Sequence, residues 1–209
     1  EQPPLPTENN VLKTFSIENE PVVELVNNRE REYIFADLPD IGYSTDIDTV
    51  MASSYQVKKQ LQQIVKIEQP ITNTLLYKRI LRIWNLTRVT TRLQVFIDNL
   101  LEDAYKDPLS GDTIIYWEDE EKAKDCDFYR INSKRDILDI PILEVMSAAR
   151  YAIEQQISMP TEDLKRLTSQ LLGFSRKGNN LDMVTEQTIQ LLIDQGIFSH
   201  ANGMVSMNN

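Results

Sequence analysis

The apolar positions of this chain repeat with an offset of 88 residues. Residues 55–104 align with residues 143–192 without a gap, although few paired residues are identical. The apolar pairs are Val57 and Val145, Val65 and Ile153, Leu76 and Leu164, Ile83 and Leu171, Leu86 and Phe174, and Leu93 and Leu181. Helix-start, helix-end and basic positions agree as well, at Asn73 and Thr161, Asn85 and Gly173, Thr87 and Ser175, and Arg88 and Arg176. Such a repeat indicates two copies of one supersecondary unit.

The first copy is predicted to contain three helices. The first helix is capped by Ser53 or Ser54, carries apolar residues at helical spacing, and ends at Pro70. The second runs from an N-cap at Asn73 to Asn85, a residue type that tolerates the left-handed conformation of a helix end. The third begins near Thr87 and has an apolar stripe as far as residue 104.

Two strand-like runs follow the third helix, Thr113–Trp117 and Phe128–Ile131, after a Pro-Leu-Ser-Gly-Asp turn. They are expected to form a hairpin with a long acidic loop. Trp117 lies in this hairpin, where a tryptophan is either exposed for stacking or, more commonly, directed into the core. Three helices and a hairpin are the components of a winged helix-turn-helix.

The second copy has the same order of predicted elements. Helices are expected from Pro141 to about Ile157, from a cap at Thr161 to Gly173, and from a cap at Ser175 to about Asp194. Two short runs, Ile197–His200 and Met204–Met207, flank Ala-Asn-Gly, which is a strong hairpin signal. The predicted fold is therefore mainly α with small β-hairpins (α+β), a tandem winged helix-turn-helix with units at residues 51–135 and 136–209.

Residues 1–50 are predicted to be a linker and N-terminal extension. The first ten residues are polar and rich in proline, as in linkers. Short strands are expected at Val22–Val26 and Tyr33–Phe35, and a loop at Asp37–Asp48. Because the chain begins at Glu1, we expect it to be part of a longer protein.

The net charge of −10 argues against a nonspecific nucleic-acid coat, but the charges are segregated. Residues 1–48 carry 11 acidic and 3 basic side chains, and residues 98–127 carry the same numbers. Residues 58–92 between them carry 8 basic side chains and 1 acidic one. This pattern predicts either a basic face or cations distributed around solvated helices.

An enzymatic function has little support in the sequence. No phosphate-binding loop of the Walker type is present, and His200 is the only histidine, which leaves no set of zinc ligands and no serine-hydrolase elbow. We expect His200 to be a surface strand residue and the acidic run Glu118–Glu121 to be solvated, with no metal or other cofactor. The single cysteine, Cys126, is predicted to be incidental, and it favours a reducing, cytoplasmic location. No apolar run is long enough to cross a membrane, and no signal peptide opens the chain.

Nucleic-acid binding is the better supported chemistry. In a helix-turn-helix the third helix enters the major groove, and residues at its start contact base edges. Arginine and lysine suit guanine or phosphate, asparagine pairs with adenine, and a helix N-terminus favours phosphate. The candidate residues are Lys78, Arg79, Arg82, Arg88, Thr91, Arg92, Arg176, Lys177, Asn179 and Asn180.

Two alternatives remain open. Arg88 and Arg176 recur at the same place in both copies, which a shared structural role explains as well as DNA contact does. The acidic wing would repel a phosphate backbone and favours a protein partner. DNA binding would be favoured if the basic candidates shared one exposed face, and it would lose support if they were paired internally. These candidates are Lys78, Arg79, Arg82, Arg88, Arg92, Arg176 and Lys177.

Two stretches carry a family resemblance. The first stretch is Glu-Gln-Pro-Ile-Thr-Asn at 68–73, followed by Leu-Leu-Tyr-Lys-Arg-Ile-Leu-Arg-Ile-Trp-Asn-Leu-Thr-Arg at 75–88. The second stretch, at 162–176, is Glu-Asp-Leu-Lys-Arg-Leu-Thr-Ser-Gln-Leu-Leu-Gly-Phe-Ser-Arg. Over residues 50–195 the chain resembles the C-terminal domain of unknown function of large bacterial superfamily-one helicases. The matching positions are Glu68, Pro70, Ile71, Arg79, Leu86 and Arg88, while Gln69 and Asn85 replace the usual glycines.

The resemblance implies an accessory module of a helicase, with the ATPase and any nuclease domain upstream. It assigns no catalytic residue. The competing interpretation is an acidic tandem winged-helix protein that resembles the segregation and condensation protein B type and binds a protein or dimerises without holding DNA tightly.

Overall fold

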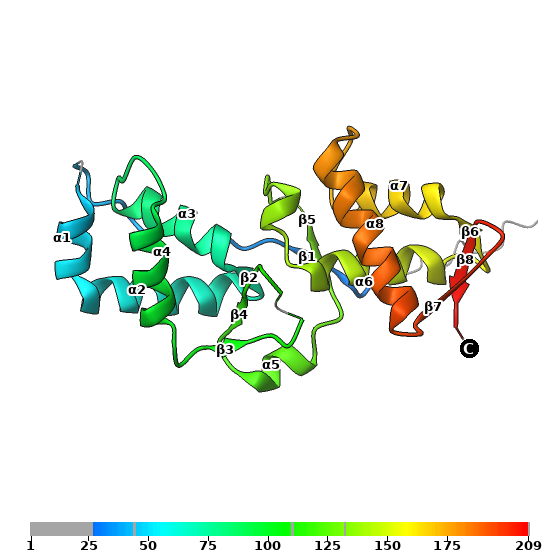
Figure 1. Cartoon of the computed structure of the whole chain (residues 1–209), viewed down its shortest axis with the longest axis horizontal. Coiled ribbons are helices and arrows are strands. Elements are labelled where there is room, and N and C mark those ends of the chain that lie inside the picture. Colours follow the sequence, from blue (N-terminus) through cyan, green and yellow to red (C-terminus); the bar gives the residue numbers. More distant parts are fainter. Residues whose placement is uncertain (1–26, 44, 110, 132, 209) are drawn as a thin grey trace, which may run out of the picture.

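In the computed structural model, residues 27–43, 45–109, 111–131 and 133–208 are described. The fold is α+β: helices predominate, and the strands form small sheets. The first half of the chain contains β1 (Glu30–Glu32), α1 (Ile47–Ala52), α2 (Ser54–Glu68), β2 (Ile71–Thr72), α3 (Asn73–Ile83), α4 (Thr91–Leu100), β3 (Tyr105–Lys106), β4 (Ile115–Trp117), α5 (Glu120–Lys124) and β5 (Tyr129–Ile131). The second contains a 3-10 turn (Ile137–Asp139), α6 (Ile142–Glu154), β6 (Met159–Pro160), α7 (Thr161–Leu171), α8 (Asn179–Asp194), β7 (Phe198–Ala201) and β8 (Met204–Met207). The two halves lie side by side along the long axis of the molecule (Figure 1).

The repeat seen in the sequence is also present in the structure. Strands β2 and β6, helices α3 and α7, and the first residues of α4 and α8 are all 88 positions apart. The sheets match too, because β2-β4-β3 and β6-β8-β7 are both antiparallel and both place the final strand of the hairpin in the centre. Each half is therefore built from a helix, a short strand, two further helices and a hairpin.

The second helix of each half ends in the same backbone conformation. Asn85 follows α3 with φ of 47°, and Gly173 follows α7 with φ of 89°. Both values lie in the left-handed region, which glycine adopts freely and asparagine tolerates. These positions confirm the helix ends predicted from sequence.

Each half has its own apolar core. Val57, Leu61, Leu76 and Leu93 join α2, α3 and α4 in the first half. In the second half, Ile153, Leu164, Leu192 and Phe198 join α6, α7, α8 and the hairpin. Trp84 and Trp117 are both buried, and the indole of Trp117 donates to the Asp107 carboxylate at 3.0 Å. The alternative of an exposed, stacking Trp117 is thereby excluded.

Several predicted helix starts differ from the observed ones. The hydroxyl of Thr72, rather than the Asn73 side chain, accepts the Leu75 amide and caps α3. Helix α4 begins at Thr91 with Thr90 as its cap, not near Thr87. The hydroxyls of Thr161 and Ser175 do not cap either, because Pro160 and Gly178 occupy the cap positions of α7 and α8. Helix α6 spans Ile142–Glu154 and is shorter than expected.

The sequence predicted the wrong partner strand for β4 in the first hairpin. Strand β4 pairs with β3, so residues 107–114, which contain the Pro-Leu-Ser-Gly-Asp sequence, connect the strands of this hairpin. Strand β5 lies in a separate sheet, parallel to β1 near the start of the chain. The acidic stretch 118–127 is therefore not the loop of the hairpin and includes the short helix α5. The second hairpin, with Asn202 and Gly203 at its turn, agrees with the prediction.

The N-terminal part was also predicted incompletely. The expected strand at Tyr33–Phe35 is replaced by β1 at Glu30–Glu32, and α1 begins inside the expected loop, with Asp46 as its cap. Residues 33–52 (Ser44 excepted), which we call the strap, run along the first half, and Ala36 and Val50 enter its core. The expected strand Val22–Val26 falls outside the described residues. None of the helices in the described part of the chain has the length and apolar character needed to cross a membrane.

Buried arginines join the two halves. Arg130 on β5 donates to the carbonyls of Glu68 at 2.7 Å and Pro70 at 2.7 Å, and it forms an ion pair with Glu144 on α6. Arg135 donates to both oxygens of the same Glu144 carboxylate at 2.7 and 2.8 Å. Burial alone would raise the pKa of Glu144, but the two guanidinium groups outweigh it and lower that pKa.

Candidate nucleic-acid interface

The candidate interface is centred on two turns that occupy equivalent positions in the repeat. Residues 84–90 connect α3 to α4, and residues 172–178 connect α7 to α8. In Figure 1 both turns lie along the upper edge of the molecule, with α4 and α8 running downwards from them. The starts of the two third helices therefore face the same side.

Arg79 does not contribute to this edge. Its guanidinium donates to both carboxylate oxygens of Glu68 on α2, at 3.0 Å and 2.9 Å, and to the hydroxyl of Tyr33 at 2.9 Å. The Glu68 side chain is fully buried, and that of Arg79 is only 17% exposed. A largely buried guanidinium that is paired with a buried carboxylate is a structural element rather than a contact for a ligand.

Three further cations of the first half have partners. Lys78 donates to both oxygens of Asp139 at 2.7 and 2.6 Å. Arg92 forms an ion pair with Asp48 on α1 at 2.8 Å. The guanidinium of Arg82 lies 4.8 Å from the centre of the Phe35 ring. Lys78, Arg82 and Arg92 nevertheless remain exposed at the surface.

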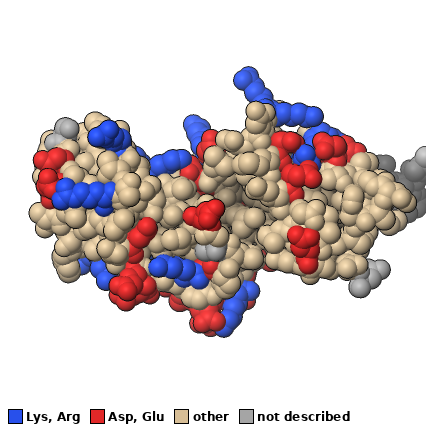
Figure 2. Space-filling view, in the orientation of Figure 1, with Lys and Arg blue, Asp and Glu red and all other residues tan. Residues whose placement is uncertain are grey.

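The remaining basic candidates are exposed and unpaired. Arg88 lies in the first turn, Arg176 and Lys177 lie in the second, and none of the three has a hydrogen bond or ion pair with a described residue. Figure 2 shows Lys and Arg side chains projecting from the second half where α8 begins, with carboxylates close by. The shared face therefore contains only part of the predicted set. Arg79 is held inside the first half, Lys78 and Arg92 are paired at the surface, and the two turns retain cations that have no partner among the described residues.

The polar candidates lie at the helix starts. Thr91 is the first residue of α4, and Asn179 and Asn180 are the first two residues of α8; all three are exposed. Helix α8 has Gly178 at its cap position and no side-chain hydrogen bond there. Its first amides are therefore oriented outwards beside Arg176 and Lys177, as the positive end of a helix requires for contact with phosphate.

A cavity of about 510 Å³ lies below the second turn, between α7 and α8. Arg176, Lys177 and Asn179 form part of its lining, together with Lys165. Lys165 is paired with three carboxylates, Glu162 at 3.3 Å, Asp182 at 2.7 Å and Glu186 at 3.0 Å. Desolvation opposes the charge of Lys165, yet the hydrogen bonds from these carboxylates raise its pKa. The three carboxylates around Lys165 are exposed, so this cavity carries negative charge beside the basic residues of the turn.

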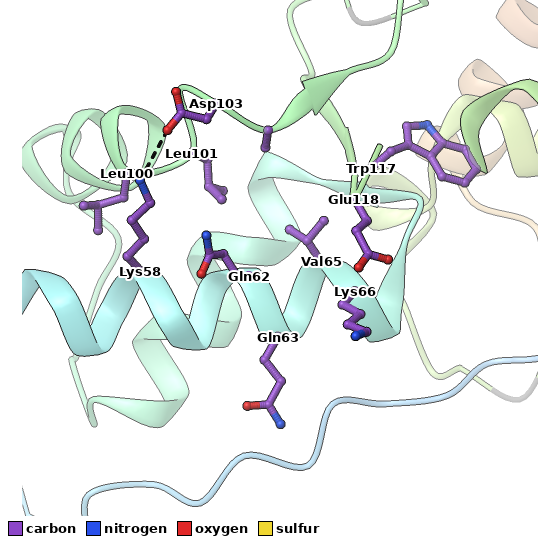
Figure 3. A pocket seen from close by; sticks show the side chains of 11 residues that line it. Lys58, Gln62, Gln63, Val65, Lys66, Leu100, Leu101, Asp103, Trp117 and Glu118 are labelled. Atoms are coloured by element: carbon purple, nitrogen blue, oxygen red, sulfur yellow. Dashed lines mark hydrogen bonds and ion pairs between the residues drawn. The ribbon is translucent and has the colours of Figure 1, made fainter. Parts of the chain in front are cut away.

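A second cavity of about 360 Å³ lies in the first half, away from the two turns. Figure 3 shows its lining: α2 supplies Lys58, Gln62 and Lys66, and the segment after α4 and the end of β4 supply Asp103 and Glu118. Lys58 reaches Asp103 at 3.4 Å. Cations and carboxylates balance around an apolar floor, so this cavity offers no excess of either charge.

The described residues contain no cluster of His, Cys, Asp and Glu suited to a metal ion. Burial raises the pKa of the Cys126 thiol to about 12, so the thiol is uncharged and a poor nucleophile at neutral pH. His200 is exposed on β7, as expected.

One structural residue could have been recognised from the sequence. Glu68 is the only acidic side chain among residues 58–92, and it continues the buried stripe of α2 at helical spacing from Ile64 and Val65. A carboxylate on an apolar stripe must have a cationic partner, which indicates Arg79 or another nearby arginine. No comparable signal marks the pairing of Lys78 with Asp139, because the latter lies in the other half of the chain.

Comparison with known proteins gives one match. A model of the family described as "Protein of unknown function (DUF3320)" matches residues 52–95. The matched segment covers α2, β2, α3 and the first half of α4, including the first of the two turns. No curated protein and no solved structure gives a significant match.

Proposed function

We propose that this chain is a non-catalytic tandem winged-helix module that binds nucleic acid, with DNA as the expected ligand. The two repeated halves would be the winged-helix units, α4 and α8 their recognition helices, and the β3–β4 and β7–β8 loops their wings. The order of the elements supports this assignment, since helix, strand, helix, helix and hairpin recur with the same sheet order.

The observation that carries the proposal is the position of the free cations. Arg88 in one half and Arg176 with Lys177 in the other occupy equivalent turns, lack internal partners among the described residues, and lie on one edge beside helix N-termini. These turns are where a helix-turn-helix meets the backbone and base edges of a duplex. Arg79 is excluded from the contact surface because Glu68 holds it internally.

The resemblance to the C-terminal segment of large bacterial helicases supports an accessory role. In this proposal the module helps a cytoplasmic DNA helicase, or a related DNA-processing protein, to grip nucleic acid, and the upstream domains perform ATP hydrolysis and any cleavage. The matched family description names no function, so the proposal depends on the two turns.

Fluorescence anisotropy with a short labelled duplex and a matched single strand tests this proposal. If four to six phosphates are neutralised, log K should fall with log salt with a slope of about −4 to −5. The variant R88E/R176E should lose binding while its circular dichroism is unchanged, and E102Q, at an exposed position away from the turns, should bind as the parent does. Absence of binding at low salt, or equal binding by R88E/R176E, would reject the proposal.

A second candidate function is protein interaction or dimerisation. The acidic segment Glu118–Glu121 is exposed around the start of α5, and the net charge is −10. This surface would suit a basic protein partner. The sequence predicted this segment as the loop of the first wing, but it is not the loop of a hairpin in the structure. Light scattering that shows a dimer in solution, together with a negative anisotropy titration, would favour this candidate.

A further inference from the structure

We infer that the strap is an electrostatic guard that restricts the contribution of the first half to nucleic-acid binding. This inference rests on the proposed function. It assigns unequal roles to two turns that the repeat makes equivalent: the second turn makes the principal contact, and Asp48 keeps Arg92 from phosphate.

The contacts of the strap are directed at the α3–α4 turn. The amide of Ile41 donates to the carbonyl of Ile83 at 3.0 Å, and the hydroxyl of Thr45 donates to the carbonyl of Trp84. Ile83 is the last residue of α3, and Trp84 is the first residue of the turn. The strap is therefore fixed next to the position where a phosphate would approach the start of α4.

The strap carries only negative charge. Residues 33–52 contain four aspartates, Asp37, Asp40, Asp46 and Asp48, and no lysine or arginine. All four are exposed, and Asp48 reaches Arg92 at 2.8 Å. Arg92 is the second residue of α4, so Asp48 engages a cation at the helix start that would otherwise face nucleic acid.

The aromatic residues of the strap reinforce this effect. Phe35 lies against the guanidinium groups of Arg79, at 4.3 Å, and Arg82, at 4.8 Å. Tyr33 accepts a hydrogen bond from Arg79. Strap residues thus engage Arg79, Arg82 and Arg92 on α3 and α4. Arg88, in the turn between these helices, has no partner among the described residues.

No ion pair of this kind joins the second turn to a described residue. Asp136 lines a cavity together with Arg176, but the two residues are not joined by a salt bridge, and the Asp136 carboxylate accepts the Leu138 amide. Arg176 and Lys177 are consequently available, whereas Arg92 must first leave Asp48. Because Ala36 and Val50 are buried in the core, the strap is a fixed part of the fold and acts through charge rather than by detaching.

The test is an anisotropy titration of the whole chain with a labelled duplex at several salt concentrations, comparing the parent with D48N and D125N. Asp125 is an exposed aspartate at the end of α5, on the opposite side of the first half, so D125N makes the same change in net charge. We expect D48N to bind more tightly than D125N and to gain about 0.9 in salt slope, as one additional phosphate contact requires. When salt is raised from about 50 to 200 mM, D48N should therefore lose about 3.5-fold more affinity than the parent does. The double variant D48N/R92A should return to the affinity of the parent.

Equal gains for D48N and D125N, or no gain for D48N, would overturn the guard while leaving the binding function intact. If the parent and D48N both fail to bind at low salt, the proposed function fails and the guard fails with it. Circular dichroism and the unfolding midpoint of each variant show that the fold is retained.

Discussion

The guanidinium of Arg130 donates to the carbonyl oxygen of Pro70 at 2.7 Å, and this contact fixes the side chain that reaches the second half of the molecule. Arg130 on β5 and Pro70, which precedes β2 and α3, both belong to the first half. The same side chain forms an ion pair with Glu144 on the first helix of the second half. The relative position of the two turns is therefore set by a buried polar network as well as by apolar packing.

Replacing Arg130 with alanine should be strongly destabilising. The change leaves Glu144 with one cationic partner and removes the donors to the Glu68 and Pro70 carbonyls. Loss of one member of a buried ion pair costs about 3–5 kcal/mol. Urea unfolding should show this loss, whereas R166A, which removes an exposed pair with Asp163, should cost less than about 1 kcal/mol. Similar effects for the two variants would contradict the structural role of Arg130.

The stability of the protein should fall in acid partly because of Glu144. Its pKa is lower in the folded chain than the value of about 4.3 expected when unfolded, so the unfolded state binds the proton first. The resulting stabilisation is complete above pH 4.3 and is lost as the pH falls through the folded pKa. In E144Q this component is absent, so the free energy of unfolding should depend less steeply on pH below about 4.5. The exposed control E102Q should follow the parent; an unchanged acid dependence in E144Q would refute the assignment.

The hydroxyl of Tyr77 should stabilise the contact between α3 and α4. It donates to the Asp98 carboxylate, with oxygen distances of 2.7 and 2.9 Å, and Tyr116 donates to the same group at 3.3 Å. Hydrogen bonds to charged groups contribute about 1.5–3 kcal/mol, and Y77F should lose an amount in that range. Tyr55 is 72% exposed, so Y55F should change the free energy of unfolding by less than about 0.5 kcal/mol. Equal values for Y77F and Y55F would show that the Asp98 contact is not made.

The equivalent helix ends should respond unequally to alanine. Asn85 and Gly173 both have positive φ, where a side chain with a β-carbon costs about 1–2 kcal/mol. G173A should therefore lose about this amount of stability, whereas N85A should lose less, because Asn85 already carries a β-carbon, and G173N should be better tolerated than G173A. G111A serves as the control, because an added Cβ meets no atom within 4 Å at either glycine but only Gly173 has φ in the left-handed region. A large loss for G111A and none for G173A would contradict the repeat in backbone conformation.

Local signals and the repeat predicted much of the fold. The 88-residue offset located α3 and α7 and both left-handed helix ends, because these features depend on nearby residues, whereas the short strands β2 and β6 were not predicted. The predicted start of α4, near Thr87, lay too early in the chain, because Thr87 and Thr90 are both suitable caps. The first hairpin was mispaired because β5 pairs with β1, a contact between distant parts of the chain that no local pattern records.

The candidate site was predicted only where exposure follows from local structure. Arg88, Arg176 and Lys177 lie in turns, and turns are exposed in most folds. Arg79 and Lys78 have the same residue types and lie on a predicted helix, but Glu68 and Asp139 engage them from other elements. Such pairing depends on tertiary structure, so composition alone overestimates the basic surface.

The most direct test of the central claim is an NMR titration of the isotopically labelled chain with an unlabelled short duplex. We expect amide shift changes concentrated at residues 172–181, with smaller changes at 84–92. R176E/K177E should abolish the changes at the second turn, and raised salt should reverse them. Shift changes confined to α5 or to the cavity between α2 and β4, or no change at low salt, would contradict nucleic-acid binding through the two turns.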